Sequence, residues 1–242
     1  MAGLDKPQVG EYLIEGMECG ALSFFAVGPV GQDLNKFRPS WEELSAQEKK
    51  EVFFQLISDL SSQLQAFHDA KHVHRDIKPD NIFRLNDGKF ILGDFGIAES
   101  EEEANEGGLL VGTTIWMSPF LPFFNSISHR NLKQAEVFSL ALVFCDFLSG
   151  KIPYQYFFDG KHYWVDTRVT VDGYWETLKE KYADFKPVLE VLQKATSGDF
   201  SEQYPSCAAF KDALIRAIAR VEPALPKEKL WSSLSSEAQK NA

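Results

Sequence analysis

Apolar residues recur three or four positions apart between residues 46 and 68, which is the spacing of one face of an α-helix. This stripe consists of Val52, Phe53, Leu56, Leu60, Leu64 and Phe67. Ser45 and Glu48 precede it at the spacing of a capping box, in which each side chain accepts a hydrogen bond from the other residue's backbone N–H. We therefore expect a long helix that begins after Ser45 and buries one side.

The helical period returns in the second half of the chain. Residues 134–148 carry apolar side chains at this spacing, and Gly150 is a typical helix stop. Residues 174–194 and 206–221 predict two further amphipathic helices, and residues 33–37 predict a short helical piece.

Strand signals are shorter. Residues 12–14 and 21–27 are apolar runs separated by two glycines, which predicts two strands and a turn. Residues 82–85 and 90–92 flank Asn86-Asp87-Gly88, a strong hairpin signal because these three residue types tolerate positive φ.

Chemistry-bearing residues lie at both ends of this predicted hairpin. His74-Arg75-Asp76-Ile77-Lys78-Pro79-Asp80-Asn81 precedes it and Gly93-Asp94-Phe95-Gly96 follows it, so Asn81 and Asp94 should be neighbours. The two motifs resemble the phosphoryl-transfer core of eukaryotic-like Ser/Thr protein kinases.

The resemblance implies a role for each residue. Asp76 would orient the substrate hydroxyl, and Lys78, typical of Ser/Thr-type loops, would steady the transferring phosphoryl group. Asn81 and Asp94 would supply oxygen ligands to Mg²⁺, which implies ATP and Mg²⁺ as cofactors. His74 and Phe95 would pack beneath the site without reacting.

Gly112-Thr113-Thr114-Ile115-Trp116-Met117-Ser118-Pro119 resembles the substrate-docking loop of this family, in which Thr113 would bridge Lys78 and Asp76. Phe120 stands where that loop usually has Glu, and Tyr204 where a later Arg usually pairs with it. Because exchanging both partners of a buried ion pair can be near neutral, we expect a Phe120–Tyr204 contact instead.

An acidic segment, residues 99–106, lies where many kinases carry a phosphorylated residue that pairs with the Arg before the catalytic Asp. Arg75 is present at that position. We hypothesise that these carboxylates stand in for phosphate, with a solvated acidic loop as the alternative.

The N-terminal side departs from the family pattern. Residues 21–34 resemble the adenine-binding hinge, where Asp33 would reach the ribose, but Pro29 lacks a backbone N–H that could bind adenine. The sequence has no Gly-rich G-x-G-x-x-G loop, and Lys6 is the only lysine before the hinge. We do not assign Lys6 the phosphate-anchoring role.

The expected fold class is therefore α+β, a protein-kinase-like fold with a mainly helical C-lobe and a reduced β N-lobe. We expect remnant N-lobe strands and hinge over residues 1–30, the kinase C-lobe over residues 31–222 and a polar tail over residues 223–242.

Net charge, −10 with a pI near 5.0, argues against nucleic acid or anionic membrane as a partner and favours basic protein substrates. Three widely spaced cysteines and the lack of a signal-peptide pattern predict a cytoplasmic protein, in the cytosol of the producer or of a host cell.

The favoured function is ATP- and Mg²⁺-dependent phosphoryl transfer to Ser/Thr of a protein. The alternatives are a pseudokinase scaffold, a fragment of a split or truncated kinase whose partner supplies the missing N-lobe elements, and, third, a small-molecule phosphotransferase.

Overall fold

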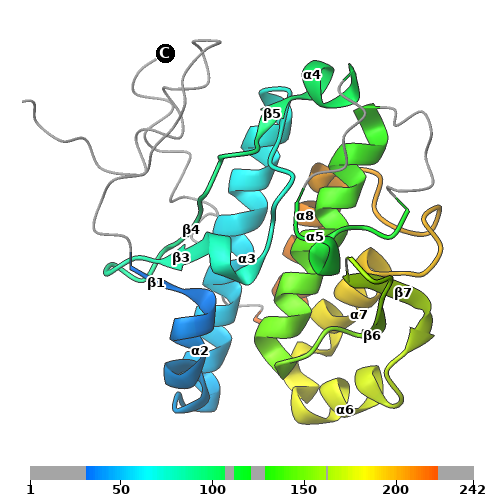
Figure 1. Ribbon diagram of the computed structural model, residues 1–242. Coiled ribbons are helices and arrows are strands. Elements are labelled where there is room, and N and C mark those ends of the chain that lie inside the picture. Colours follow the sequence, from blue (N-terminus) through cyan, green and yellow to red (C-terminus); the bar gives the residue numbers. More distant parts are fainter. Residues whose placement is uncertain (1–30, 107–111, 121–128, 162, 223–242) are drawn as a thin grey trace, which may run out of the picture.

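The structure is a computed structural model that describes residues 31–106, 112–120, 129–161 and 163–222. Two long helices, α3 (Ala46–Asp69) and α5 (His129–Ser149), lie at its centre (Figure 1). The predicted capping box is present at the start of α3: the Glu48 backbone N–H donates to Ser45 Oγ at 3.3 Å, and the Ser45 N–H donates to Glu48 Oε2 at 2.9 Å. The predicted stripe faces the core, where Phe53, Leu56, Leu60 and Leu64 are buried.

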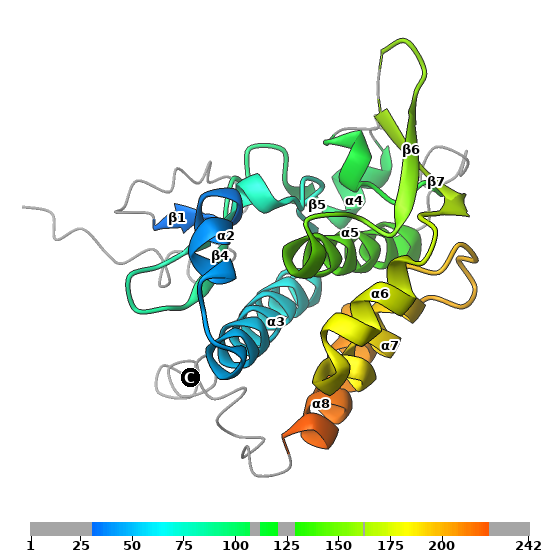
Figure 2. The ribbon, with the colours of Figure 1, turned by 90° about the horizontal axis from the view of Figure 1, so that it is seen from below.

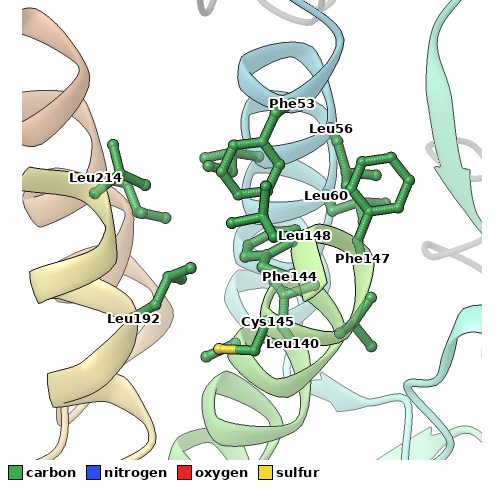
Figure 3. Close-up of a cluster of buried hydrophobic side chains, with 14 of the residues drawn as sticks. Phe53, Leu56, Leu60, Leu140, Phe144, Cys145, Phe147, Leu148, Leu192 and Leu214 are labelled. Atoms are coloured by element: carbon green, nitrogen blue, oxygen red, sulfur yellow. The ribbon is translucent and has the colours of Figure 1, made fainter. Parts of the chain in front are cut away.

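Helix α5 is buried on nearly all sides from residue 135 onward. Figure 3 shows Leu140, Phe144, Phe147 and Leu148 packing between α3 and the later helices. Leu192 of α7 (Lys186–Ala195) and Leu214 of α8 (Cys207–Val221) close the same cluster. A helix that is apolar all round requires neighbours all round, and α3, α7 and α8 supply them.

One predicted helix is interrupted. Residues 174–194 form α6 (Tyr174–Lys181), a 3-10 turn (Ala183–Phe185) and then α7, so the prediction of a continuous helix is wrong. Pro187 explains the break, because proline lacks the N–H that a helix interior needs but fits the first turn of a new helix. The prediction for residues 206–221 is confirmed by α8, where Ser206 caps the N-terminus.

The predicted hairpin is confirmed. Strand β3 (Ile82–Arg84) pairs antiparallel with β4 (Phe90–Leu92), and Gly88 in the turn has a φ of 90°. Strand β1 (Gln32–Asp33) pairs with the other edge of β3, which gives a three-stranded sheet of order β1-β3-β4. Asp33 then caps α2 (Leu34–Glu42), which is longer than the predicted piece.

Two further strand pairs complete the described part of the chain. Strand β2 (His72–Val73) pairs with β5 (Glu99–Ser100), which leads into α4 (Glu101–Glu106). Strands β6 (Tyr154–Phe158) and β7 (Tyr163–Thr170) form an antiparallel hairpin that the sequence did not predict. Figure 2 shows this hairpin projecting beside α5.

The mixture of helices and small sheets confirms the α+β class. The predicted strands before residue 28, the hinge with Pro29, and the tail after residue 222 lie outside the described residues. Cys145 and Cys207 are buried free thiols. None of the described helices combines the length and apolar character needed to cross a membrane.

Candidate active site

Asp76 is the centre of a connected group of polar side chains. Lys78 Nζ lies 2.6 Å from Asp76 Oδ2, and Asn81 Nδ2 donates to the same oxygen at 3.0 Å. Thr113 donates to Asp76 Oδ1 through its backbone N–H at 2.9 Å and its hydroxyl at 2.8 Å. Lys78 Nζ also donates to Thr113 Oγ1 at 2.9 Å, so Thr113 bridges Lys78 and Asp76 as predicted.

These contacts keep Asp76 ionised. Burial raises the pKa of this carboxyl, but hydrogen bonds from Lys78, Thr113 and Asn81 and the Lys78 charge outweigh burial and lower the pKa below its ordinary value of 3.8. A carboxylate of this kind can accept a hydrogen bond from a hydroxyl and hold it in a fixed direction.

Glu136 of α5 anchors the loop that carries Asp76 by binding the backbone of Arg75. The sequence pattern did not reveal this role. Glu136 Oε1 accepts a hydrogen bond from the Arg75 backbone N–H at 2.6 Å, and Glu136 Oε2 lies 2.7 Å from His68 Nε2 on α3. Glu136 is 6% exposed, so it joins the loop that carries Asp76 to both central helices through buried polar contacts.

The backbone is unusual in both motifs. Three described non-glycine residues have positive φ, and two of them are Arg75 at 67° and Asp94 at 58°. Such conformations cost about 1–3 kcal/mol each and persist where surrounding contacts fix them, often at functional sites. Here the Glu136 contact fixes the first of these residues.

His74, the first residue of the first motif, is fully buried and contacts the second motif. Its Nε2 lies 3.0 Å from the Gly93 carbonyl oxygen, and its Nδ1 accepts from the Asp76 N–H at 3.3 Å. Its ring packs against Phe95 with a centroid distance of 4.9 Å, and Phe67 joins the same stack. His74 and Phe95 therefore have the packing role that was expected.

Burial lowers the pKa of His74 from its ordinary value of 6.5. The unfolded chain therefore takes up a proton below about pH 6.5 that the folded chain does not, so the free energy of unfolding should fall as pH drops through this range. Urea unfolding of the wild type and His74→Asn at several pH values checks this, because the variant should lose that part of the pH dependence. Identical pH dependences would contradict it.

Asn81 and Asp94 lie at adjoining strand ends, as predicted. The Gly93 N–H donates to the Asn81 carbonyl oxygen at 2.8 Å, which ties the residue before Asp94 to Asn81. The Asn81 amide nitrogen is used by Asp76, so its Oδ1 is the atom available to a cation. Asp94 is exposed, and its Oδ1 accepts only a long 3.4 Å bond from the Gly96 N–H among the described residues. This oxygen pair fits Mg²⁺, which uses few protein ligands.

Asp33 makes only local contacts among the described residues. Its Oδ1 accepts from the Lys36 backbone N–H at 3.0 Å and its Oδ2 lies 2.7 Å from Lys36 Nζ. The carboxylate therefore caps α2, and the structure does not bring it to the Asp76 group.

The segment after the second motif is tied to Arg75. The guanidinium Nε donates to the Ile97 carbonyl oxygen at 2.6 Å, and Nη1 lies 2.7 Å from Glu99 Oε2. Glu101 instead pairs with Lys133 of α5 at 3.0 Å. Among the described side chains of the acidic segment, Glu99 is thus the one that pairs with Arg75.

Phe120 and Tyr204 take other partners than the predicted ones. The Phe120 ring packs on Phe200 at 5.4 Å, while Tyr204 packs on Phe210 at 5.5 Å and lies beneath Lys194. The expected Phe120–Tyr204 contact is therefore wrong, because each ring packs on a different aromatic neighbour.

Comparison with known proteins supports the resemblance that the motifs indicate. A family model described as "Protein kinase domain" matches residues 30–215. Serine/threonine-protein kinase pkn3 of Myxococcus xanthus is 26% identical over 208 residues, which cover 81% of this chain and 36% of that protein. Serine/threonine-protein kinase PknE of Mycobacterium tuberculosis is 36% identical over 102 residues, which cover 41% of this chain and 17% of that protein.

Serine/threonine-protein kinase AtPK1/AtPK6 of Arabidopsis thaliana is 32% identical over 97 residues, or 40% of this chain and 20% of that protein. The chain therefore spans only a minor part of the length of these relatives. The family model covers most of the chain, and the residues with kinase motifs meet around Asp76, so this chain belongs to the protein kinase domain family.

Proposed function

We propose that this protein transfers the γ-phosphate of ATP to Ser or Thr hydroxyls of a protein substrate. The observation that carries the proposal is the ionised Asp76 carboxylate, held by Lys78, Thr113 and Asn81. Membership of the kinase family and relatives named as serine/threonine-protein kinases support the same reaction.

Each residue of the group then has a task. Asp76 accepts the hydrogen bond of the substrate hydroxyl and directs its oxygen toward the phosphate. Lys78 lies between Asp76 and Thr113, where its ammonium group stabilises negative charge on the transferred group. Asn81 Oδ1 and the Asp94 carboxylate would hold Mg²⁺, which neutralises phosphate charge when bound.

A second candidate function is a binding scaffold without turnover. It is favoured by the sequence before residue 30, where Lys6 is the only lysine and no G-x-G-x-x-G loop occurs. Retention of the Asp76, Asn81 and Asp94 arrangement favours catalysis, because a scaffold has no physical need for these groups together.

Label transfer from γ-labelled ATP to a mixture of basic proteins distinguishes the two functions. We expect incorporation that requires Mg²⁺ and is lost in Asp94→Ala but kept in Asp212→Ala, a control at an exposed position of α8. Folded wild-type protein that incorporates no label would favour the scaffold.

The Arg75–Glu99 pair is the described contact through which the acidic segment could act on the site. Glu99→Gln removes the charge that holds the segment to Arg75, and we expect kcat to fall about 2- to 5-fold, as suits a partly exposed ion pair. Glu102→Gln, at an exposed neighbouring position, should leave kcat unchanged. Initial rates of label transfer measure both, and equal rates for wild type and Glu99→Gln would contradict this role.

A further inference from the structure

The β6–β7 hairpin carries an unusual surface. Tyr156, Phe157 and Phe158 are consecutive, and 55%, 50% and 55% of their respective surfaces are exposed. Within the described residues, these three and Val169, also on this hairpin, are the exposed large apolar side chains. Because successive side chains of a strand point to opposite faces, Tyr156 and Phe158 share one face of β6 and Phe157 lies on the other. Exposed apolar side chains gathered on one face typically mark an interaction surface.

The base of the hairpin is firmly packed. Tyr154 and Val165 are buried in a small cluster with Phe138 and Leu142 of α5 and with Ile152. The Tyr154 hydroxyl donates to the Thr196 carbonyl oxygen. The exposed aromatic residues therefore stand on a fixed support, and Figure 2 shows the two strands extending from it.

This support is shared with the candidate docking loop. Ile115 and Trp116 pack against the same cluster as Tyr154 and Val165. Two residues earlier in that loop, Thr113 bonds directly to Asp76. The base of the hairpin is thus joined to Asp76 through one short segment, residues 113–116.

Charge does not dominate the hairpin. Residues 154–170 contain two acidic side chains, Asp159 and Asp166, and two basic ones, Lys161 and Arg168, although the whole chain has a net charge of −10. A partner at this surface would be recognised by apolar contact, because no excess of either sign steers a charged group to it.

The size of the surface favours a short segment over a second copy of the chain. Aromatic side chains bury about 150–250 Å² each when fully covered, so the two half-exposed ones on one face offer roughly 200 Å². A stable protein dimer needs about 800 Å² per partner. One or two apolar side chains of a peptide match the smaller area.

We propose that Tyr156 and Phe158, on one face of β6, bind an apolar side chain of the protein substrate, at a position flanking the phosphorylated residue. This inference rests on the proposed function, and it adds a substrate class: Ser/Thr segments with a neighbouring aliphatic or aromatic residue. Asp76 would select the hydroxyl, and the hairpin would select the flanking residue.

A defined peptide library tests this proposal. Each peptide has a central Ser and random neighbours, except for one flanking position fixed as Leu, Phe, Asp or Lys. We compare the wild type with the double variant Tyr156→Ser, Phe158→Ser and with a double Leu variant that keeps the surface apolar. Phe158→Ser alone is a milder variant if the double Ser protein melts early.

The wild type should prefer Leu or Phe at one flanking position by about tenfold in kcat/KM, as suits one apolar contact. The Ser variants should lose this preference but keep their turnover on peptides without an apolar residue at the flanking position. The Leu variant should retain the preference. A preference that survives in the Ser variants, or no apolar preference in the wild type, would overturn the proposal.

Binding of the same peptides without ATP separates this inference from the proposed function. If no peptide is phosphorylated, the proposed function fails, and capture of Leu or Phe peptides that depends on the hairpin would still support docking. Capture unaffected by the Ser substitutions would overturn it. A stable wild-type dimer that becomes monomeric in the double Ser variant would assign the surface to self-association and also overturn the proposal.

Discussion

Replacing Asp76 by Asn should lower kcat by about 10²- to 10⁴-fold and leave the Kd of ATP with Mg²⁺ nearly unchanged. Asn keeps the shape of the side chain and one oxygen acceptor for Thr113, but it has no charge for Lys78 and no basic oxygen for the substrate hydroxyl. The loss should therefore lie in the chemical step.

Steady-state rates and ATP titration on the same samples measure this split. Asp212→Asn, an exposed change on α8, is the control and should behave like the wild type. A variant that loses ATP binding in proportion to kcat would show that Asp76 supports the site as a whole, and an unchanged kcat would remove it from the mechanism.

Glu136→Ala should lower both stability and turnover. Removing this carboxylate leaves the Arg75 backbone N–H and His68 Nε2 without their buried acceptor, which costs about 1–3 kcal/mol of unfolding free energy. The catalytic loop also loses its fixed contact to α5, so kcat should fall about tenfold as Asp76 moves from its productive position.

A conservative replacement of Glu136 separates its effect on the position of the loop from its effect on stability. Glu136→Gln keeps an oxygen for the Arg75 N–H, so it should recover most of kcat even where urea unfolding still shows reduced stability. Glu190→Ala, at an exposed site on α7, is the matched control. If Glu136→Ala loses stability but keeps the wild-type kcat and KM at a temperature where it is folded, Glu136 does not position the loop.

Features governed by short sequence spacing were predictable. The capping box at Ser45, the turn at Gly88 and the neighbouring positions of Asn81 and Asp94 all follow from residues a few positions apart. The bridge from Thr113 to Asp76 spans 37 positions, and it came from the family resemblance instead.

Features that depend on tertiary packing were missed or wrong. Glu136 lies within a helical pattern whose apolar members were read as the core, and nothing local marks its carboxylate as buried beneath Arg75. Likewise, Phe120 packs on Phe200 because the fold places residue 200 beside it. The family pattern pairs Phe120 with Tyr204, and it does not show which aromatic ring lies closest in space.

The β6–β7 hairpin could not be predicted from the spacing of its apolar residues. Tyr154 to Phe158 is almost uniformly aromatic, so it lacks the alternation of a half-buried strand, although Asp159-Gly160 is a turn signal. The hairpin forms because its base can join α5 and the docking loop in one apolar cluster, and that opportunity exists only in the folded chain.

Phosphate transfer to protein hydroxyls by the Asp76 group can be measured directly. Wild-type protein and Asp76→Asn are each incubated with ATP, Mg²⁺ and the basic protein mixture, and phosphorylated residues are mapped by mass spectrometry. We expect phosphoserine and phosphothreonine with the wild type and neither with the variant. Folded wild-type protein that binds ATP yet yields no phosphorylated residue, or the same sites from both proteins, would contradict this expectation.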